Sequence, residues 1–326
     1  MVQINEAPEP ELAVGQVLVK IKAAGINYAD VVARSGFYPD APKFPFIPGY
    51  EFAGIVEKIN GAAKIKIGDR VMGVTMFGAQ AEFVAVNEDQ LLAIPDKMSF
   101  EDAAAIPVNY LTAYFALFKL GNLREGEKVL IHSCAGGVGT AATQLASLKK
   151  AEIFGTTSSD AKVAHAVANG VRRPINYNKS DFSAEILRFT DGRGVNIVLD
   201  PVGGKTFKKS LRLLAPGGRI ICYGVADLLA GGRKNILKIG WKYLSLPRVK
   251  VLDLIQSNRC IFGLSLNRFI DQSAYIIPVL SELIKFYVDG LIKPILSRIF
   301  NYNECAEAHA FLESGKSCGK LILKFE

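Results

Sequence analysis

The stretch KVLIHSCAGGVGTAATQLA, residues 128–146, decides the fold of this chain. An alternating run typical of a β-strand, 129–132, leads into a turn of small residues and then into an Ala/Thr/Gln/Leu pattern typical of a helix. Glycines in such a turn let the backbone approach a diphosphate, and the first N–H groups of the helix point toward it. The turn reads AGGVG, 135–139, instead of GxGxxG, so a tight connection without a ligand is the alternative. We favour a dinucleotide site because the flanking strand, the helix and the downstream pattern agree with one.

The sequence after this turn alternates between strand and helix patterns, which predicts an α/β fold with a doubly wound parallel sheet and right-handed crossovers. A further strand, helix and strand follow, and we expect this closing segment to return to the first domain. The expected strands are 129–132, 153–156, 196–200, 219–223, 260–266 and 319–324, with helices beginning near Gly139, Ser159, Asp181 and Lys205 and a last helix at 273–288.

The region before the turn, 12–98, is predicted to be β-rich, with short strands between Gly, Pro and Asp turns. A helix is expected from Ser99 to Leu120, with Ser99 and Asp102 forming a cap and Pro107 breaking or kinking the run. The domain boundaries are placed at 1–108, 109–262 and 263–326. The strands expected here are Val17–Ala23, Phe52–Ile59, Arg70–Gly73 and Ala81–Val86.

The bulk composition suits a globular protein. Of the 326 residues, 50% are apolar and 21% charged, and no apolar run approaches the ~18 residues that a membrane-spanning helix needs. The opening MVQINEAPEPE lacks the apolar block of a signal peptide. Five cysteines without a CxxC pair argue against a disulfide framework, so a reducing cytoplasm is expected. The net charge of +8 suits an anionic ligand but identifies no partner.

Several segments spread along the chain resemble the medium-chain dehydrogenase/reductase superfamily, in its zinc-free quinone oxidoreductase branch. Within that branch, DPVGG and YGVADLLAGGRKN are most similar to the synaptic vesicle amine transport protein homologues. The matching segments include AAGINYADVVARSGFYP, PFIPGYEFAGIV, IKIGDRVMG, KVLIHSCAGGVG, GRGVNIVLDPVGG, LLAPGGRIICYG and GKLIL.

The resemblance implies a GroES-like β-rich catalytic domain wrapped around a central Rossmann domain. It also implies a homodimer formed by edge-to-edge pairing of the Rossmann sheets, here through the strand CIFGLSL. Relatives have about one strand and a turn before VQINEAPEPE, so either the true start lies upstream or Met1 is an alternative start.

Zinc enzymes of this superfamily hold their metal with Cys, a Gly-His-Glu motif and a further Cys or Asp. Here Asn27 stands at the Cys position, and the motif reads Gly49-Tyr50-Glu51. The three histidines show no ligand spacing, and no metal site is expected. Without a Lewis acid, alcohol oxidation loses its main activation, which favours reduction of an acceptor that is already electrophilic.

The residues after the second central strand favour NADPH over NADH. The strand ends in Thr156, Thr157 and Ser158, with no carboxylate there to repel a 2′-phosphate. Asp160 is interpreted as a first-turn helix acid. The resemblance places Ser158, Lys162 and Tyr177 around the 2′-phosphate, although Lys162 could instead be a solvated helix residue.

The implied reaction is hydride transfer to a quinone or an α,β-unsaturated carbonyl compound. The resemblance assigns Asn27 and Tyr38 as catalytic candidates, Asn27 beside the nicotinamide and Tyr38 as proton donor or orienting group. The alternatives are a turn asparagine and an aromatic surface cover. Tyr50 and Cys134 are interpreted as packing residues. The implied cofactor contacts, besides Asn27 and the three phosphate candidates, are Thr112, Ala135, Gly136, Gly137, Val138, Tyr223, Gly224, Leu264, Leu266 and Lys320.

A basic insert, 228–252, contains six Lys or Arg residues and no acid. If it is helical, Lys234, Lys238 and Lys242 share one face, with Ile236, Ile239 and Tyr243 opposite. A weak membrane-surface contact, a lid and a solvated face all remain open. Nucleic acid is not expected, because aromatic residues are not interleaved as stacking platforms. The insert supports the alternative function, a non-catalytic membrane-associated adaptor that retains the reductase fold.

Overall fold

The computed structural model describes residues 2–229 and 248–326, so most of the basic insert, including its three aligned lysines, lies outside the described residues. The chain divides into two compact units. The first unit contains the chain up to Leu111 together with Leu266–Glu326, and the second unit contains Thr112–Ser265.

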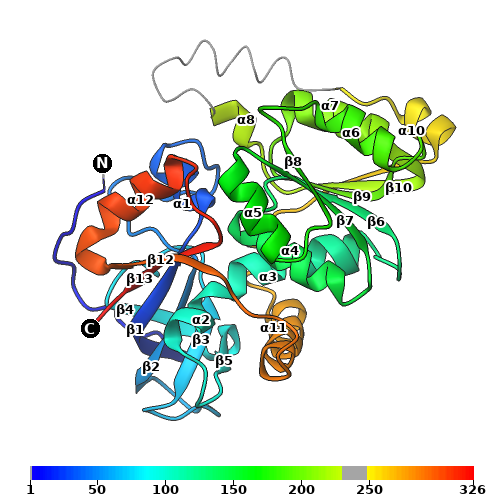
Figure 1. Ribbon diagram of the computed structural model, residues 1–326. Coiled ribbons are helices and arrows are strands. Elements are labelled where there is room, and N and C mark those ends of the chain that lie inside the picture. The colour runs from blue at the N-terminus through cyan, green and yellow to red at the C-terminus, as the bar shows by residue number, and fades with distance from the viewer. Residues whose placement is uncertain (1, 230–247) are drawn as a thin grey trace. The chain divides into compact units, whose positions relative to one another are not determined.

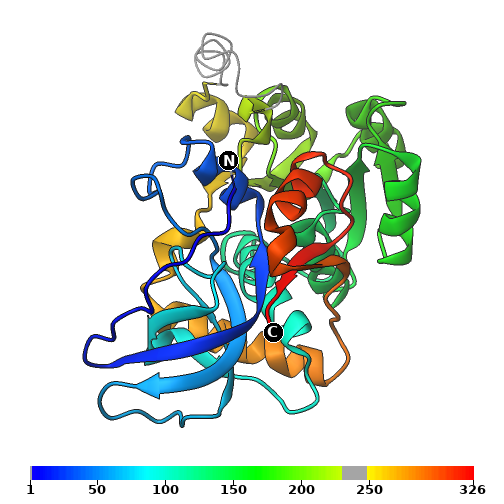
Figure 2. The same cartoon turned by 90° about the vertical axis from the view of Figure 1, so that its left-hand side faces the viewer.

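The first unit is built on a seven-stranded sheet, ordered β12-β13-β1-β2-β3-β5, with β4 also pairing with β1 (Figure 2). Strand β13, near the C-terminus, runs antiparallel to β1, with Ile26 opposite Leu321. On its other side β1 pairs antiparallel with β2, with Ala24 opposite Phe52. The closing segment therefore returns to the first sheet. The strands are β1 (Gln16–Ile26), β2 (Glu51–Ile59), β3 (Arg70–Val74), β4 (Phe83–Asn87), β5 (Leu91–Ala93), β12 (Leu296–Asn301) and β13 (Lys320–Lys324).

Alternating apolar side chains of this sheet, among them Val17, Val19, Ile21 and Phe52, pack into one core. Burial of such side chains stabilises the unit by roughly 25 cal/mol per Å² of apolar surface. The helical segments are α1 (Tyr28–Arg34), η1 (Glu88–Gln90), α2 (Phe100–Ala105), α3 (Pro107–Tyr114), η3 (Leu266–Phe269), α11 (Ser273–Val288), η4 (Tyr302–Glu304) and α12 (Cys305–Glu313).

The second unit contains a six-stranded parallel sheet, ordered β11-β10-β9-β6-β7-β8 (Figure 1). Numbered within the unit, the order is 3-2-1-4-5-6 from β8 to β11, which is the dinucleotide-binding arrangement. The predicted doubly wound parallel sheet is confirmed. Its elements are η2 (Phe115–Leu120), β6 (Lys128–Ile131), α4 (Gly137–Ser147), β7 (Glu152–Thr157), α5 (Asp160–Ala168), β8 (Arg173–Asn176), α6 (Phe182–Phe189), β9 (Val195–Asp200), α7 (Gly204–Leu213), β10 (Leu214–Cys222), α8 (Ala226–Leu229), α10 (Val251–Ser257) and β11 (Cys260–Gly263).

Two strands of the parallel sheet differ from the prediction: one was missed and one is shorter than expected. Strand β8 was not predicted, because RPIN is short, contains Pro174 and lies at the sheet edge. Strand β11 ends at Gly263, so Leu266, expected inside the strand, begins the 3₁₀ turn η3. β11 forms the other edge of the sheet, as edge-to-edge dimerisation would require, and the dimer stays a prediction.

The predicted helix over 99–120 is interrupted at the expected place. Helix α2 ends at Ala105 and α3 begins at Pro107, which lacks the N–H that a continuing helix would need. Ser99 caps α2 by accepting a 3.0 Å hydrogen bond from the backbone N–H of Asp102. Within the described residues, no helix is both long and apolar enough to cross a bilayer.

Candidate cofactor and active site

The Gly-rich turn lies at the carboxyl end of β6, the first central strand. Gly136 is the N-cap of α4, and the first intrahelical bond runs from Thr140 N–H to Gly136 C=O at 2.8 Å. The N–H groups of Gly137, Val138 and Gly139 precede that bond, so they have no acceptor within the helix. Three such amides at a helix start are the arrangement that a bound phosphate group would need.

Close packing beneath the turn explains its composition. A Cβ at Gly139 would lie 2.4 Å from the carbonyl oxygen of Ser133, so only glycine fits there. Cys134 is fully buried, and burial raises the pKa of its thiol to about 12. This supports Cys134 as a packing residue, because a thiol so rarely ionised is a poor nucleophile. Ala135 is also buried, while Gly136, Gly137 and Val138 are half-buried.

The 2′-phosphate candidates come from the ends of two neighbouring strands. Ser158 directly follows β7, and Tyr177 directly follows β8 and donates its backbone N–H to Thr157 C=O at 3.0 Å. Lys162 lies in the first turn of α5, and its positive charge lowers the pKa values of both Cys134 and His165, although burial remains the largest influence on each. The three candidates thus follow the end of β7, the start of α5 and the end of β8.

Asp160 does begin α5, in agreement with its interpretation as a helix-start acid. Its carboxylate is held by Lys179 at 2.5 Å and by the side-chain amide of Asn176 at 2.8 Å. The hydrogen bond from Lys179 is the largest influence that lowers the pKa of Asp160. The acid is thus turned toward its own partners on and after β8.

The ends of β9, β10 and β11 bring further candidates together. Leu264 donates its backbone N–H to Cys222 C=O at 2.8 Å, and Tyr223 donates to Asp200 C=O at 3.1 Å. Gly224 packs against Pro201, whose carbonyl oxygen would lie 2.7 Å from an added Cβ. Because the N–H of Leu264 already donates to Cys222, only the carbonyl oxygen of Leu264 remains to accept a hydrogen bond from the nicotinamide carboxamide.

Two buried polar atoms in this unit agree with a cofactor at this edge of the sheet. Asp200 Oδ1 accepts hydrogen bonds from the N–H groups of Val202 and Gly203, but its buried Oδ2 has no partner among the described residues. The buried hydroxyl of Thr140, in the first turn of α4, likewise has no hydrogen-bond partner among the described residues. Together with the Gly-rich turn, these groups fit a bound dinucleotide.

A buried histidine behind the turn has a structural role. His132 hydrogen-bonds Thr156 at 2.9 Å and Ser210 at 2.7 Å through its two ring nitrogens. Burial lowers its pKa to about 4, so the ring stays neutral near neutral pH. It ties β6, β7 and α7 together, a function that the sequence pattern did not reveal.

In the first unit, Asn27 lies within a buried polar cluster. Its Nδ2 donates to Glu51 Oε1 at 2.8 Å, and its Oδ1 accepts from Lys320 Nζ at 2.6 Å. Lys320 also forms an ion pair with Glu51, and Glu51 Oε2 accepts the backbone N–H of Val108 at 2.6 Å. Lys320 was expected near the cofactor; in the structure its ammonium group binds Asn27 and Glu51, and a cofactor contact stays a prediction.

Asp30 fixes the backbone around this cluster. Its carboxylate oxygens accept the N–H of Asn27 and the N–H of Gly49, each at 2.8 Å. Complete burial is the largest cause that raises the pKa of Asp30, to about 7, while the two backbone hydrogen bonds and the charge of Lys320 lower it. Nothing in the sequence pattern indicates this role, because an acid in the first turn of a helix is common.

Tyr38 and Tyr50 belong to an aromatic group in the same unit. The Tyr38 hydroxyl accepts a 2.6 Å hydrogen bond from Asn267 Nδ2, and its ring centre lies 6.1 Å from that of Tyr50. Tyr50 is almost fully buried, and its ring centre lies 5.0 Å from that of Phe77. This agrees with its interpretation as a packing residue. Burial is the largest cause that raises its pKa above the ordinary value.

The remaining candidates occupy less informative positions. Thr112 is buried in α3, and Leu266 is buried at the start of η3. Among residues 2–229 and 248–326, no group of three His, Cys, Asp or Glu side chains is arranged to hold a metal ion. Asn27 and Tyr50, which the sequence resemblance assigned to zinc-ligand positions, make the contacts described above.

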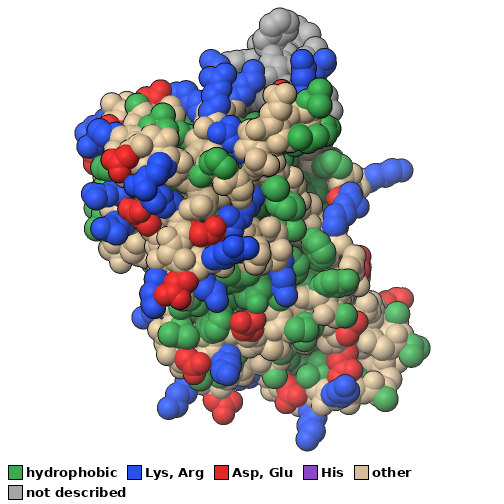
Figure 3. All heavy atoms as spheres, turned by 90° about the vertical axis from the view of Figure 1, so that its right-hand side faces the viewer, with side chains coloured by type: hydrophobic (Ala, Val, Ile, Leu, Met, Phe, Trp, Pro, Cys, Tyr) green, Lys and Arg blue, Asp and Glu red, His purple; other side chains and the backbone are tan. Residues whose placement is uncertain are grey.

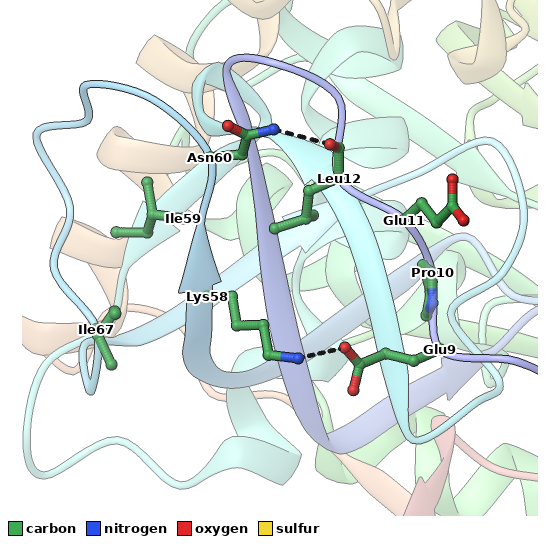
Figure 4. A pocket seen from close by; sticks show the side chains of 8 residues that line it. All are labelled: Glu9, Pro10, Glu11, Leu12, Lys58, Ile59, Asn60 and Ile67. Atoms are coloured by element: carbon green, nitrogen blue, oxygen red, sulfur yellow. Dashed lines mark hydrogen bonds and ion pairs between the residues drawn. The ribbon is translucent and has the colours of Figure 1, made fainter.

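A surface hollow in the first unit lies at the opposite end of β2 from Glu51 (Figure 4). The segment before β1 borders it, fixed by a Lys58–Glu9 ion pair at 2.5 Å and by a 2.8 Å bond from Asn60 to Leu12 C=O. None of the predicted site residues lines it.

Comparison with known proteins agrees with both units. Residues 13–96 match the alcohol dehydrogenase GroES-like domain, and residues 137–282 match the family described as zinc-binding dehydrogenase. The predicted combination of a GroES-like domain with a Rossmann sheet is thus confirmed.

Individual relatives cover nearly the whole chain. The human synaptic vesicle membrane protein VAT-1 homolog is 38% identical over 323 residues, which cover 98% of this chain and 82% of that protein. The mouse quinone oxidoreductase-like protein 2 is 32% identical, with coverages of 98% and 87%. The crystal structure of Escherichia coli quinone oxidoreductase complexed with NADPH superimposes with a TM-score of 0.87 at 30% identity, covering 99% of this chain and 95% of that one. The chain therefore belongs to the medium-chain dehydrogenase/reductase superfamily, close to the VAT-1 homologues and the quinone oxidoreductase-like proteins.

Proposed function

We propose that the protein is an NADPH-dependent, zinc-independent reductase that transfers hydride to quinones or α,β-unsaturated carbonyl compounds. The observation that carries the proposal is the Gly-rich start of α4 at the end of β6, followed by a second strand that ends without a carboxylate. The coarser conclusion, a quinone-oxidoreductase-like fold of the oxidoreductase class, already follows from the family. The NADPH in the related Escherichia coli structure supports the cofactor.

The residues around the 2′-phosphate position favour NADPH. Lys162 supplies a positive charge from the first turn of α5, and Ser158 and Tyr177 supply hydroxyl groups from neighbouring strand ends. Asp160, the one acid near this position in the sequence, is neutralised by Lys179. A 2′-phosphate would therefore meet donors instead of a repelling carboxylate.

When bound, NADPH would supply a hydride from its nicotinamide ring to the electrophilic carbon of the acceptor. Asn27 would donate a side-chain N–H to the acceptor oxygen on which negative charge develops. Tyr38, whose hydroxyl oxygen accepts a hydrogen bond from Asn267, would donate a proton to the acceptor. Solvent would then restore that proton.

The test combines binding and turnover. NADPH and NADH are titrated against the protein by nicotinamide fluorescence, and oxidation of NADPH is then followed with 1,4-benzoquinone and with 2-cyclohexenone. We expect saturable binding, tighter for NADPH, and turnover of at least one acceptor that survives prior treatment with a metal chelator. Failure to bind either nucleotide would refute the proposal.

A second candidate, a membrane-associated adaptor, is favoured by the surface of α10. Its side chains Val251, Leu252 and Ile255 are 71%, 67% and 64% exposed, and Arg248 and Lys250 are exposed just before them. Figure 3 shows Lys and Arg side chains on one face of the described residues, interspersed with apolar side chains and with Asp and Glu. Exposed apolar groups beside basic ones suit an anionic lipid surface.

Sedimentation with vesicles of phosphatidylcholine and phosphatidylserine tests this candidate. Replacing Val251, Leu252 and Ile255 by serine should abolish sedimentation, whereas Val14→Ser, at another exposed valine, should not. Wild-type protein that stays in the supernatant at low salt would eliminate the adaptor and leave the reductase proposal intact.

A further inference from the structure

The first unit buries an ion pair that hydride transfer does not itself require. The side chains of Lys320 and Glu51 are 4% and 0% exposed. Removing two ions from water is unfavourable, and two well-packed apolar side chains would often serve stability equally well. A buried pair in this position therefore invites a role beyond stability.

The sheet register brings the pair together with Asn27. Ile26 lies opposite Leu321, so the next residues outward are Asn27, directly after β1, and Lys320, at the start of β13. Ala24 lies opposite Phe52, which puts Glu51 beside the same strand end. Gly25 leaves room for the carboxylate, since a Cβ there would lie 2.4 Å from Glu51 Oε1. Three adjacent strands thus converge on one amide group.

The contacts determine how the Asn27 amide is oriented. Its Oδ1 faces the Lys320 ammonium at 2.6 Å, and one Nδ2 hydrogen faces Glu51 at 2.8 Å. Turning the amide over would direct NH₂ at the ammonium and the oxygen at the carboxylate, and both contacts would become repulsive. One Nδ2 hydrogen remains, because a carboxamide has two.

The charge on Lys320 also changes the strength of that remaining donor. A cation on the amide oxygen withdraws electron density from the nitrogen, so the second N–H becomes a stronger donor. Asp30 holds the backbone N–H of Asn27 at 2.8 Å and so restricts movement of the whole residue. The donor is therefore both fixed in place and polarised.

We propose that Lys320 is a positioning residue, a built-in cation that together with Glu51 orients and polarises the Asn27 amide toward the oxygen of a carbonyl acceptor. The inference rests on the proposed reductase function. It also gives a reason why a chain with Asn27 and Tyr50 at the positions of zinc ligands can still stabilise a developing oxyanion. The fixed positive charge acts through the amide and does not touch the substrate.

The test uses Lys320→Met and the double variant Lys320→Met/Glu51→Gln. The double variant leaves neither charge buried alone, so it is the safeguard if the single variant fails to fold. Lys324→Met is the matched control, because Lys324 lies on the same strand, is 61% exposed and pairs with Glu101 at 3.4 Å. Each variant is measured for NADPH affinity and for kcat and KM with 2-cyclohexenone and with 1,4-benzoquinone.

We expect kcat for the enone to fall about 10- to 100-fold in the double variant, somewhat less than for deletion of a whole oxyanion donor. The quinone, which is far more electrophilic, should lose less than about threefold, with NADPH affinity and the control unchanged. A folded double variant with unaltered enone kcat would overturn the proposal. So would a loss of NADPH affinity without a selective loss on the enone, which would assign Lys320 to the cofactor.

A measurement without turnover separates this inference from the reductase proposal. The side-chain amide of Asn27, labelled with ¹⁵N, should give two widely separated proton signals in the wild type, and Lys320→Met/Glu51→Gln should bring them together. If wild-type protein reduces neither acceptor, the reductase proposal fails while this result still tests the polarised amide. Signals that do not move would overturn the role of Lys320.

Discussion

Gly155 on β7 lies directly against Cys134 in the Gly-rich turn, and a Cβ added at Gly155 would be 2.5 Å from the cysteine Sγ. The same Cβ would meet Cys134 Cβ and Val171 Cγ1 at 2.9 Å each. Cys134 is fully buried, so it cannot move aside without displacing its own neighbours or opening toward solvent. The shape of the Gly-rich turn therefore depends on the absence of a side chain at Gly155 in the neighbouring strand.

Gly155→Ala should destabilise the protein by about 1–3 kcal/mol, as overpacking of a core does, and should weaken NADPH binding. Urea unfolding and nicotinamide fluorescence check the two effects. Gly263→Ala on β11 is the matched control, because a Cβ there meets nothing within 4 Å. Equal stability of the two variants would contradict the packing argument.

Lys162→Ala should weaken NADPH binding by a factor of about 10 to 150, corresponding to the 1.5–3 kcal/mol of a charge-assisted hydrogen bond. NADH affinity should hardly change, because NADH has no 2′-phosphate. Lys179→Ala is a control from the same region, since that lysine is paired with Asp160. A parallel loss for both nucleotides would show that Lys162 does not read the phosphate.

The two candidate sites differed in how far the sequence revealed them. The Gly-rich turn could be predicted because strand, turn and helix are contiguous, so local chemistry identifies the diphosphate site. The partners of Asn27 could not, since Lys320 and Glu51 are separated by 269 residues and meet only through the register of β13, β1 and β2. GKLIL was predicted as a strand, but nothing local indicates which acid its lysine would meet.

The missed and shortened strands have a similar cause. RPIN forms β8 because β7 offers it a free edge, although Pro174 and the short length argue against a strand. The β-type run after Cys260 continues past Gly263 in the sequence, but pairing with β10 stops at Gly263 opposite Cys222. Tertiary pairing decides both boundaries.

Gly25→Ala should displace Glu51, because the new Cβ would lie within 2.7 Å of three side-chain atoms of that carboxylate. Glu51 cannot simply turn away, since it is fully buried and binds Asn27, Lys320 and the backbone of Val108. A loss of about 3 kcal/mol or more in unfolding free energy is expected, as for a broken buried ion pair. Denaturant unfolding measures this loss. The double variant Gly25→Ala/Glu51→Ala should relieve the clash but should not restore the ion pair with Lys320.

Asp30 should make stability depend on pH in a window from about 4 to about 7. Its pKa is raised from 3.8 in the ordinary state to about 7 in the fold, so between these values the folded protein retains a proton that the unfolded chain has lost. Stability from this group is complete below the lower value and is lost as pH rises through the upper one. Wild-type unfolding free energy should thus fall across the window by more than that of Asp30→Asn.

The Asp30→Asn variant should be less stable at every pH, because a carboxamide offers one oxygen where Asp30 accepts from both Asn27 and Gly49. That constant difference carries no information about ionisation, so the slope against pH is the quantity compared. Identical slopes for wild type and variant would mean that Asp30 is ionised throughout, stabilised by its two backbone donors and by Lys320.

Tyr38→Phe should slow enone reduction about 100-fold or more, as expected for loss of a general acid, and should slow hydride transfer to a quinone, which is far more electrophilic, by much less. The phenyl ring keeps the packing against Tyr50 at 6.1 Å, so the change removes only the hydroxyl that Asn267 orients. Tyr302→Phe, at a partly exposed tyrosine stacked on Phe325, controls for loss of a phenol from the same unit. Steady-state rates with both acceptors check the prediction. Equal slowing on enone and quinone would assign Tyr38 to general packing of the unit, because a proton donor should matter more for the less electrophilic acceptor.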